Sequence, residues 1–357
     1  MGAAQKWPIM RIMVRKLHLE LDEPQSPPSL FDVAEEAAPW FLPEGAAEDD
    51  LPPGPRAERV TLFDPALWLE AQGTLSGDLA SACIAFGRLD ARLAGAGEGM
   101  RLRLALQEVA DLGWHAGARI GLERLALFVA LRVGAGDEAA LLGQSAWGVR
   151  RLTGTMPVLA QVAGGRECLA SFLGFEGDAV LDLAATLDGI DMLHPVTQAA
   201  FLFHAWKMAA AERGAKEIEG GVMAARHAGA RLGRGALFLP LVLGSGTALR
   251  GQGSVEARLA AFFRGAEQAT LAALMQIERI TDWQLRALAV LQDRSGRTPR
   301  ELVEVFARWP LVSAPMAEAQ TGASRAAVQR NLDLMAQRGM IREITGQGRY
   351  RIWTVAL

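Results

Sequence analysis

The sequence predicts a mainly α fold: a multi-helix, bundle-like body followed by a small C-terminal domain of three helices and a β-hairpin. Alanine, leucine, arginine and glutamate, which favour helix, dominate the 357 residues, and strand-forming runs are scarce. Apolar residues recur at helical spacing from about residue 61 to 292. Half of the residues are hydrophobic and 22% are charged, as expected for a globular chain with a sizeable core.

The first 60 residues differ in composition from the rest. Eight of the 16 prolines lie between residues 22 and 59, and acidic residues cluster at 48–50. Such a segment buries too little apolar surface to order itself. We therefore predict three parts: a largely disordered N-terminal segment with a Pro-rich acidic linker over 1–60, an all-helical domain over 61–292, and a C-terminal domain over 293–357.

Apolar periodicity predicts the helices of the body. They cover residues 78–93, 100–112, 120–133, 137–152, 178–187, 195–212, 217–232 and 255–291. The 120–133 segment is apolar on every side, which predicts a buried helix. The longest helix, 255–291, carries an apolar stripe of Leu259, Phe262, Phe263, Leu271, Leu274, Ile277 and Ile280. This stripe suggests a homodimer formed through the 255–291 helix.

Charge is distributed unevenly along the chain. Residues 294–357 hold ten arginines and five carboxylates, a balance of +5, so the net charge of −3 leaves −8 on the remainder. A basic end on an acidic body fits a local polyanion-binding site, although chance segregation of charge would give the same numbers.

Helix-capping signals define the C-terminal domain. Thr298 and Glu301 have the spacing of a capping box and predict a first helix that stops before Pro310. Ser313 and Ser324 are placed to cap a second and a third helix, with a turn at 322 between them. Residues 340–344 and 350–355 then form a hairpin around a glycine turn. This succession is typical of a winged helix-turn-helix domain, which binds double-stranded DNA.

The third helix, 325–338, has two distinct sides. Val328, Leu332 and Met335 recur at spacings of four and three residues and predict the buried side. The other side and the hairpin supply the predicted DNA contacts: Ser324, Arg325, Ala326, Gln329, Arg330, Asp333, Arg342, Gln347, Arg349 and Arg351. Arg330 suits guanine and Gln329 adenine. Ser324, Arg325, Arg349 and Arg351 are expected to hold the DNA backbone.

Three stretches, 311–319, 321–332 and 342–353, resemble the end of an alphaproteobacterial family that is often plasmid-borne. Its members join a helical domain of unknown function to a C-terminal helix-turn-helix DNA-binding domain. A weaker likeness extends through 66–70, 193–195 and 238–241, so the resemblance covers most of the chain after residue 60. It implies DNA binding.

Two more distant resemblances concern single motifs. Ser324-Arg325, Arg330 and the hairpin glycines at 346 and 348 resemble GntR-type repressors, in which the same positions touch DNA. GntR proteins carry this module at the N-terminus, so the resemblance implies nothing about an effector domain in this chain.

His194-Pro195 is similar to the start of the Fic-type nucleotidyl transferase motif. The glycine-rich anion hole and the arginine of that motif are replaced by Ala199, Ala200, Phe201 and Leu202. Ala66 also stands where the hydroxyl residue of the Fic inhibitory pattern, around Glu70, belongs. This resemblance implies at most a catalytically degenerate relative.

Motifs for other chemistry are lacking in the sequence. The glycines between 244 and 253 lack a Walker A lysine, and there is no nucleophile elbow. Cys83 and Cys168 form no CxxC pair. His194, His204 and His227 are more simply core or capping residues than metal ligands. We therefore expect no enzyme, no cofactor and no metal.

The sequence also bears on location and partners. We expect neither a signal peptide nor a membrane span, since the most apolar stretch, 236–243, is far too short, and we expect a cytoplasmic protein. Tryptophans 68, 114, 147, 206 and 283 would lie in the core or line a small-molecule effector pocket.

These observations predict a sequence-specific double-stranded DNA-binding protein that acts as a transcriptional or replicon-associated regulator. The alternatives are a degenerate Fic-like or nucleotide-binding helical protein, and an interaction scaffold that docks proteins through its winged helix.

Overall fold

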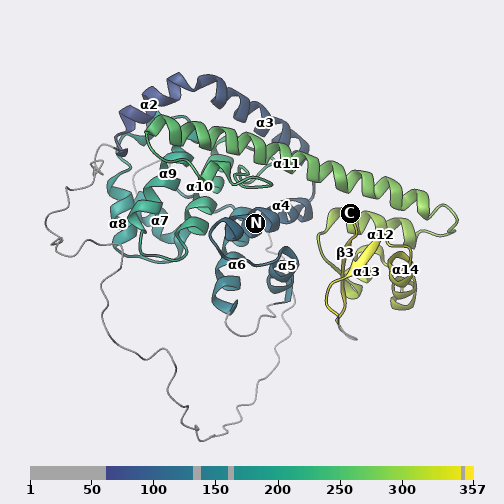
Figure 1. Ribbon diagram of the computed structural model, residues 1–357. Helices are drawn as coiled ribbons and strands as arrows, with labels where there is room; N and C mark the ends of the chain where they lie inside the picture. The colour runs from purple at the N-terminus through teal and green to yellow at the C-terminus, as the bar shows by residue number, and fades with distance from the viewer. Residues whose placement is uncertain (1–61, 132–137, 160–164, 347–349) are drawn as a thin grey trace, which may run out of the picture. The chain divides into compact units, whose positions relative to one another are not determined.

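The computed structural model describes residues 62–131, 138–159, 165–346 and 350–357 (Figure 1). The predicted disordered segment, 1–60, lies outside the described residues. The mainly α fold class is confirmed, because helices form nearly all of the described body and the described strands all belong to one small C-terminal sheet.

The body is built from ten α-helices and two short 3-10 helices over its described residues. In chain order they are α2 (Pro65–Thr74), α3 (Ser76–Ala94), α4 (Glu98–His115), α5 (Leu122–Leu131), α6 (Ala139–Thr153), α7 (Gly165–Leu173), α8 (Asp178–Ala185), η3 (Ile190–Met192), α9 (Pro195–Ala209), α10 (Lys216–Leu232), η4 (Thr247–Leu249) and α11 (Val255–Val290). All eight predicted body helices are present, and their ends differ from the prediction by a few residues.

Two helices, α2 and α7, were not predicted. Helix α2 has no one-sided apolar pattern, whereas α7 does bury one side, through Leu169, Ala170, Phe172 and Leu173, and this signal was missed. The start of α2 does carry a sequence signal, because Asp64 accepts a hydrogen bond from the backbone N–H of Ala66 at 2.9 Å and Pro65 follows it. A capping residue followed by proline therefore identifies this helix better than its apolar pattern does.

The prediction that 120–133 forms a buried helix is wrong. Only Leu125 and Ala126 of α5 are buried, and Leu122 and Leu131 are exposed. Helix α5 packs against α4 and α6 on one side only. Apolar residues on all sides of a short helix therefore did not imply burial on all sides.

Helices α9 and α10 form the centre of the body, where they pack against each other (Figure 1). Every residue of α9 from Val196 to Trp206 is buried. Glycine in α10 permits close packing, since a Cβ at Gly221 would lie 2.5 Å from a methyl group of Leu112 on α4. Helices that are buried on all sides are the expected interior of a large helical domain.

A buried carboxyl group ties α4 to the segment before α11. Glu108 is fully buried, and its Oε1 atom accepts hydrogen bonds from the backbone N–H groups of Leu241 at 2.8 Å and Val242 at 3.2 Å. Burial raises the pKa of Glu108 to about 8 despite these bonds. The side chain thereby pairs backbone groups of a buried segment that has no helix or strand partner.

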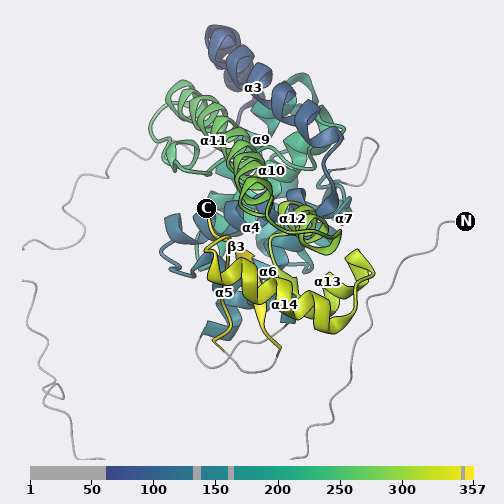
Figure 2. The same cartoon turned by 90° about the vertical axis from the view of Figure 1, so that its right-hand side faces the viewer.

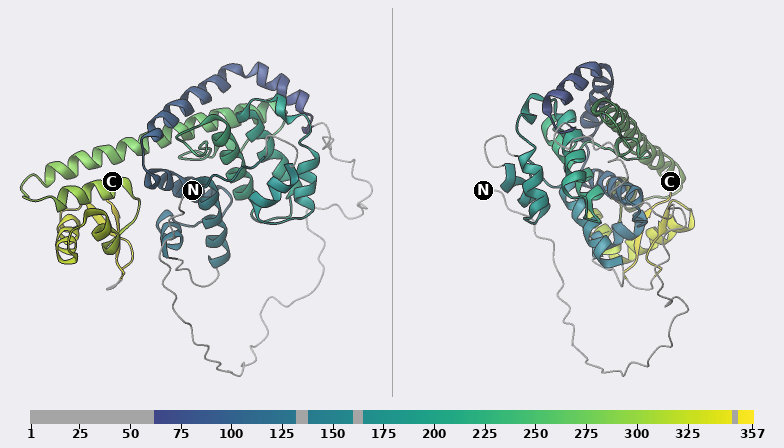
Figure 3. Two further views of the ribbon diagram at one scale, coloured as in Figure 1. Left: turned by 180° about the vertical axis from the view of Figure 1, so that it is seen from behind. Right: turned by 60° about the vertical axis from the view of Figure 1, so that its left-hand side comes forward.

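Helix α11 belongs to two hydrophobic cores. Leu259 and Ile277 pack in the core of the body, whereas Ile280 and Trp283 pack with the C-terminal helices and strands. Figure 3 shows this green helix continuing from the body into the C-terminal part of the chain. The second core thus begins inside α11, upstream of the predicted domain start at 293.

Most of the apolar stripe of α11 is used within the chain, whereas Leu271 is exposed, and the predicted homodimer through this helix stays a prediction. Leu259, Phe262, Phe263, Ile277 and Ile280 are all buried within their own chain. They cover the body and the C-terminal core, so these residues are not available to a second copy. Dimerisation through α11 would have to use its exposed side.

The C-terminal part consists of three helices and a three-stranded antiparallel sheet (Figure 2). In chain order the elements are α12 (Thr298–Arg308), β1 (Val312–Ser313), α13 (Ala314–Thr321), α14 (Arg325–Gln337), β2 (Ile341–Glu343) and β3 (Ile352–Val355). Strand β3 lies between the other two, with Ser313 opposite Ile352 and Glu343 opposite Trp353.

The predicted capping box is wrong in detail. Helix α12 begins at Thr298, so Arg297 is its N-cap residue and makes no side-chain capping bond. Glu301 pairs instead with the Arg297 guanidinium at 2.8 Å. An ion pair one turn apart therefore replaces the reciprocal hydrogen bonds of a capping box.

Replacing Trp283 with alanine tests whether α11 is an essential part of the C-terminal core. Trp283 is buried, and its Nε1 donates a hydrogen bond to the Met340 carbonyl at 2.8 Å. We expect Trp283→Ala to lower the free energy of unfolding by about 3–5 kcal/mol in chemical denaturation. Trp114→Ala, at an exposed position, is the control and should cost less than about 1 kcal/mol. Equal losses of unfolding free energy in the two variants would contradict the conclusion that α11 is part of the C-terminal core.

Stability should depend on pH with a maximum near 6.5. Burial lowers the pKa of both His204 and His227 to about 3, so below about pH 6.5 the unfolded chain binds two protons that the folded chain does not. Glu108, with its pKa of about 8, acts in the opposite direction between its unfolded pKa of 4.5 and pH 8. Each group changes the free energy of unfolding by at most about 1.4 kcal/mol per pH unit.

Together, these three groups lower the free energy of unfolding by about 1.4 kcal/mol per pH unit as the pH falls from 6.5 to 4.5, and by a similar amount as it rises from 6.5 to 8. Glu108→Gln removes the group responsible for the second loss. We therefore expect the free energy of unfolding of this variant, measured by chemical denaturation between pH 5 and 8.5, to stay nearly constant above pH 6.5. A variant that keeps the wild-type loss would refute the assignment to Glu108.

Candidate nucleic-acid interface

Helices α13 and α14 form a helix-turn-helix whose ends are fixed by local sequence. The Ser313 hydroxyl accepts a hydrogen bond from Met316 N at 3.4 Å, and the Ser324 hydroxyl accepts one from Ala327 N at 3.4 Å. Gly322 ends α13 with a φ of +64°, a conformation that glycine adopts without strain. These predicted caps and the predicted turn are confirmed.

Helix α14 has the two predicted sides. Val328, Leu332 and Met335 are fully buried in the C-terminal core. Ser324, Arg325, Ala326 and Arg330 are exposed. The helix therefore presents its N-terminal amides, two arginines and one small residue to solvent, a combination suited to phosphate and to close approach.

Most of the other described arginines of the C-terminal domain are bound to carboxylates. The pairs are Arg294–Asp293, Arg297–Glu301, Arg338–Asp293, Arg342–Glu123 and Arg351–Glu343. Within the described part of the chain, Arg325 and Arg330 of α14 make no ion pair, and neither do Arg300 and Arg308 of α12. The positive charge of α14 is thus available to a ligand.

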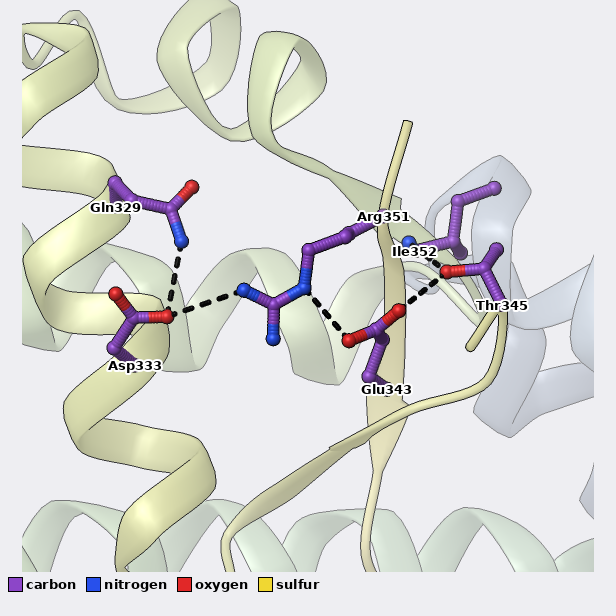
Figure 4. Close-up of polar contacts among 6 residues, drawn as sticks. All are labelled: Gln329, Asp333, Glu343, Thr345, Arg351 and Ile352. Carbon is purple, nitrogen blue, oxygen red and sulfur yellow. Dashed lines mark hydrogen bonds and ion pairs between the residues drawn. The ribbon is translucent and has the colours of Figure 1, made fainter. Parts of the chain in front are cut away.

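Arg351 lies in a chain of polar contacts between α14 and the hairpin (Figure 4). Its Nε donates to Glu343 Oε2 at 2.6 Å, and its Nη1 lies 3.5 Å from Asp333 Oδ1. The same Asp333 atom accepts a hydrogen bond from Gln329 Nε2 at 2.9 Å. Three residues predicted to contact DNA are therefore brought together by bonds to one another.

Arg351, predicted to hold the DNA backbone, has partners within the fold. Its guanidinium faces two carboxylates and also lies 4.9 Å from the centre of the Trp353 ring. Glu343 neutralises it on the hairpin side. A phosphate contact by Arg351 would therefore compete with its bonds to Glu343 and Asp333.

The hairpin pairs β2 with β3, and Ile344 N donates to Ile352 O at 3.0 Å at its outer end. Trp353 is 1% exposed and attaches the hairpin to the helices, whereas Tyr350 is 76% exposed. Of these two hairpin aromatic residues, only Trp353 therefore packs against the helices. Gln347 and Arg349 lie outside the described residues.

Arg342 is not among the residues joined by the polar contacts between α14 and the hairpin. It forms an ion pair with Glu123 of α5, in the body. A contact between Arg342 and DNA, as predicted, would compete with this pair.

A hollow of about 580 Å³ lies beside α14. Residues from α5, β1, α13, α14 and the β3 region line it, including Ser313, Arg325, Gln329, Arg351 and Trp353. Two of the predicted contact residues on α14, Arg325 and Gln329, therefore line one hollow together with apolar residues such as Pro315 and Trp353.

The comparisons with known proteins agree with this geometry. Residues 299–356 match a family described as an HTH DNA-binding domain. The chain contains a helix-turn-helix DNA-binding domain. The match spans α12 to β3 and supports binding to double-stranded DNA. A search of curated proteins finds no match.

Sequence reasoning missed the partners that hold the helix-turn-helix domain's polar residues in place. Glu343, Thr345 and Glu123 were not predicted to take part. Gln329 and Asp333 are four residues apart on one helix, a spacing that predicts their hydrogen bond. The Arg351–Glu343 pair depends on the register of the hairpin, and the Arg342–Glu123 pair on tertiary packing, so neither has a local signal.

The histidines of the body have partners within the fold. His227 Nε2 lies 2.7 Å from Gln198 Oε1, and His204 Nδ1 lies 3.3 Å from an Arg258 nitrogen. His194 Nδ1 accepts a hydrogen bond from Val196 N and caps α9. Across the described residues, no three His, Cys, Asp or Glu side chains gather in a way that would hold a metal ion.

Among the helices that the structure describes, none combines the length and the apolar character needed to cross a membrane.

Proposed function

We propose that the protein is a sequence-specific double-stranded DNA-binding regulator that reads the major groove with α14. The exposed side of this helix carries the proposal: Arg325 and Arg330 are unpaired there, opposite the buried Val328 and Leu332. Arginine in the major groove pairs bidentately with guanine, which makes Arg330 the proposed reader of a G·C base pair. Ala326, one turn earlier, leaves room for the groove floor.

Ser324 and Arg325 are the proposed phosphate contacts. They lie at the N-terminus of α14, where unpaired backbone amides and the helix dipole attract an anion. The hairpin is proposed to act as the wing. Arg349, which the sequence places in the wing, would then contribute a further phosphate contact.

The regulatory role, transcriptional or replicon-associated, rests on the resemblance to plasmid-borne proteins of the same domain order. We further propose that the protein acts in the cytoplasm, where its DNA target would lie, and by binding rather than by catalysis. The positions that would form the Fic anion hole, Ala199 to Leu202, are fully buried in the middle of α9. We also propose that the protein binds a small-molecule effector and forms a dimer through the exposed side of α11.

Two arginine variants test the roles assigned to α14. Arg330→Ala should relax sequence preference and weaken binding to the preferred duplex by about 1–3 kcal/mol, with little change on random DNA. Arg325→Ala should weaken binding to every sequence and reduce the slope of log K against log salt by about 0.9. Both are measured by fluorescence anisotropy with the full chain between 50 and 300 mM salt.

Arg279→Ala, on the exposed surface of α11 in the body, controls for the loss of one positive charge. It should leave both the preference and the slope close to those of the wild type. An equal loss on all sequences for Arg330→Ala would remove it as a base reader. Absence of salt-dependent binding by the wild-type chain would overturn DNA binding itself and favour protein docking.

A further inference from the structure

The Gln329 side chain has a defined orientation. A carboxylate only accepts hydrogen bonds, so the Gln329 Nε2 group must face Asp333 Oδ1, to which it donates at 2.9 Å. The amide oxygen of Gln329 then lies on the side away from Asp333 (Figure 4). One N–H and the carbonyl oxygen of the same amide are left without a hydrogen-bond partner in the described structure.

Asp333 is held in turn by the hairpin. Arg351 bridges Asp333 Oδ1 and Glu343 Oε2, and the Thr345 hydroxyl donates to the other Glu343 oxygen at 2.7 Å. Thr345 also accepts a hydrogen bond from the backbone N–H of Ile352 at 3.3 Å. A continuous series of polar contacts therefore runs from the backbone of the hairpin to the Gln329 amide.

The register of the hairpin explains why Arg351 occupies this place. Glu343 lies directly opposite Trp353 in the sheet, and Arg351 precedes Trp353 by two residues, so all three side chains lie on one face. The Arg351 guanidinium packs near the Trp353 ring while it binds Glu343. Its position is thus set by the sheet and does not need a ligand.

We propose that Asp333 and Arg351 are positioning residues that hold the Gln329 amide in the orientation that reads adenine. Adenine presents an N6 donor and an N7 acceptor in the major groove, and an amide with a free oxygen and a free N–H matches both. Fixing the amide in advance reduces the rotational freedom lost on binding. The proposal rests on the proposed function, since it assumes that α14 enters the major groove.

The charges fit a positioning role better than direct contact. An unpaired Asp333 carboxylate on the DNA-facing side would be repelled by phosphates, and Arg351 offsets that charge. Arg351 shares its own charge between two carboxylates and so offers little to the DNA backbone. This distinguishes it from Arg325, one turn before Gln329 on α14, which has no carboxylate partner within the described structure.

Selection from a randomised duplex library with the full chain tests the proposal. We expect the wild-type chain to select an A·T base pair whose preference Gln329→Ala reduces by about tenfold or more. Asp333→Ala should lose most of the preference at that same base pair and keep the preference that depends on Arg330. The double variant should lose no more than Gln329→Ala alone, because both changes remove one interaction.

Arg351→Gln gives a second, independent readout. As a positioning residue it should weaken the same A·T preference and leave the salt slope unchanged. If it instead weakens binding to all sequences equally and lowers the slope by about 0.9, Arg351 is a phosphate contact and the proposal is overturned. Retention of the wild-type A·T preference by Asp333→Ala overturns it equally.

Asp282→Ala, on the exposed side of α11, controls for the loss of one negative charge and should leave the selected sequence unchanged. Thermal unfolding of each variant checks that the fold is kept, and Asp333 is exposed enough to tolerate substitution, at 45% of its side-chain surface. A wild-type chain that binds no DNA would overturn the proposed function as well. Sequence-specific binding that is indifferent to Asp333 and Arg351 would overturn only their positioning role.

Discussion

The structure depends on one continuous helix that is buried in two hydrophobic cores. Leu259 and Ile277 of α11 pack in the body, and Ile280 and Trp283 pack beneath the helix-turn-helix. A helix that is anchored on both sides of residues 277–280 cannot bend there without exposing apolar surface on one side. The DNA-binding domain is therefore attached to the body by a stiff element and not by a flexible linker.

A second contact, from α4, reinforces this attachment. Arg103 donates to the carbonyl oxygens of Phe306 and Trp309 at 3.1 and 2.8 Å, where α12 ends and its carbonyls lack helical partners. Gly99 allows the approach, since a Cβ there would lie 2.2 Å from the Arg308 carbonyl oxygen. Because α4 also carries Glu108, which binds the segment before α11, this one helix holds both the end of α12 and the approach to α11.

Sequence reasoning predicted the elements whose cause is local. Ser313 and Ser324 cap helices through atoms three residues away, and Val328, Leu332 and Met335 reveal the buried side of α14 by their spacing alone. It was wrong about the burial of α5, and it did not reveal the packing partners of other elements. The apolar stripe of α11 indicated a dimer face because the sequence does not show that α3, α9 and α12 already cover it. Arg351 was assigned to DNA because its partner Glu343 is brought close only by the hairpin.

The distribution of charge is the clearest case in which the sequence does not show the packing partners. The ten arginines after residue 293 suggest a uniformly basic surface. In the fold, Asp293 and Glu301 near α12, Glu123 in the body and Glu343 in the hairpin bind five of them. An arginine bound to a carboxylate orients its neighbours, whereas an unpaired one can attract phosphate. The carboxylates thus divide the arginines into those that shape the domain and those, Arg325 and Arg330 among them, that remain available to DNA.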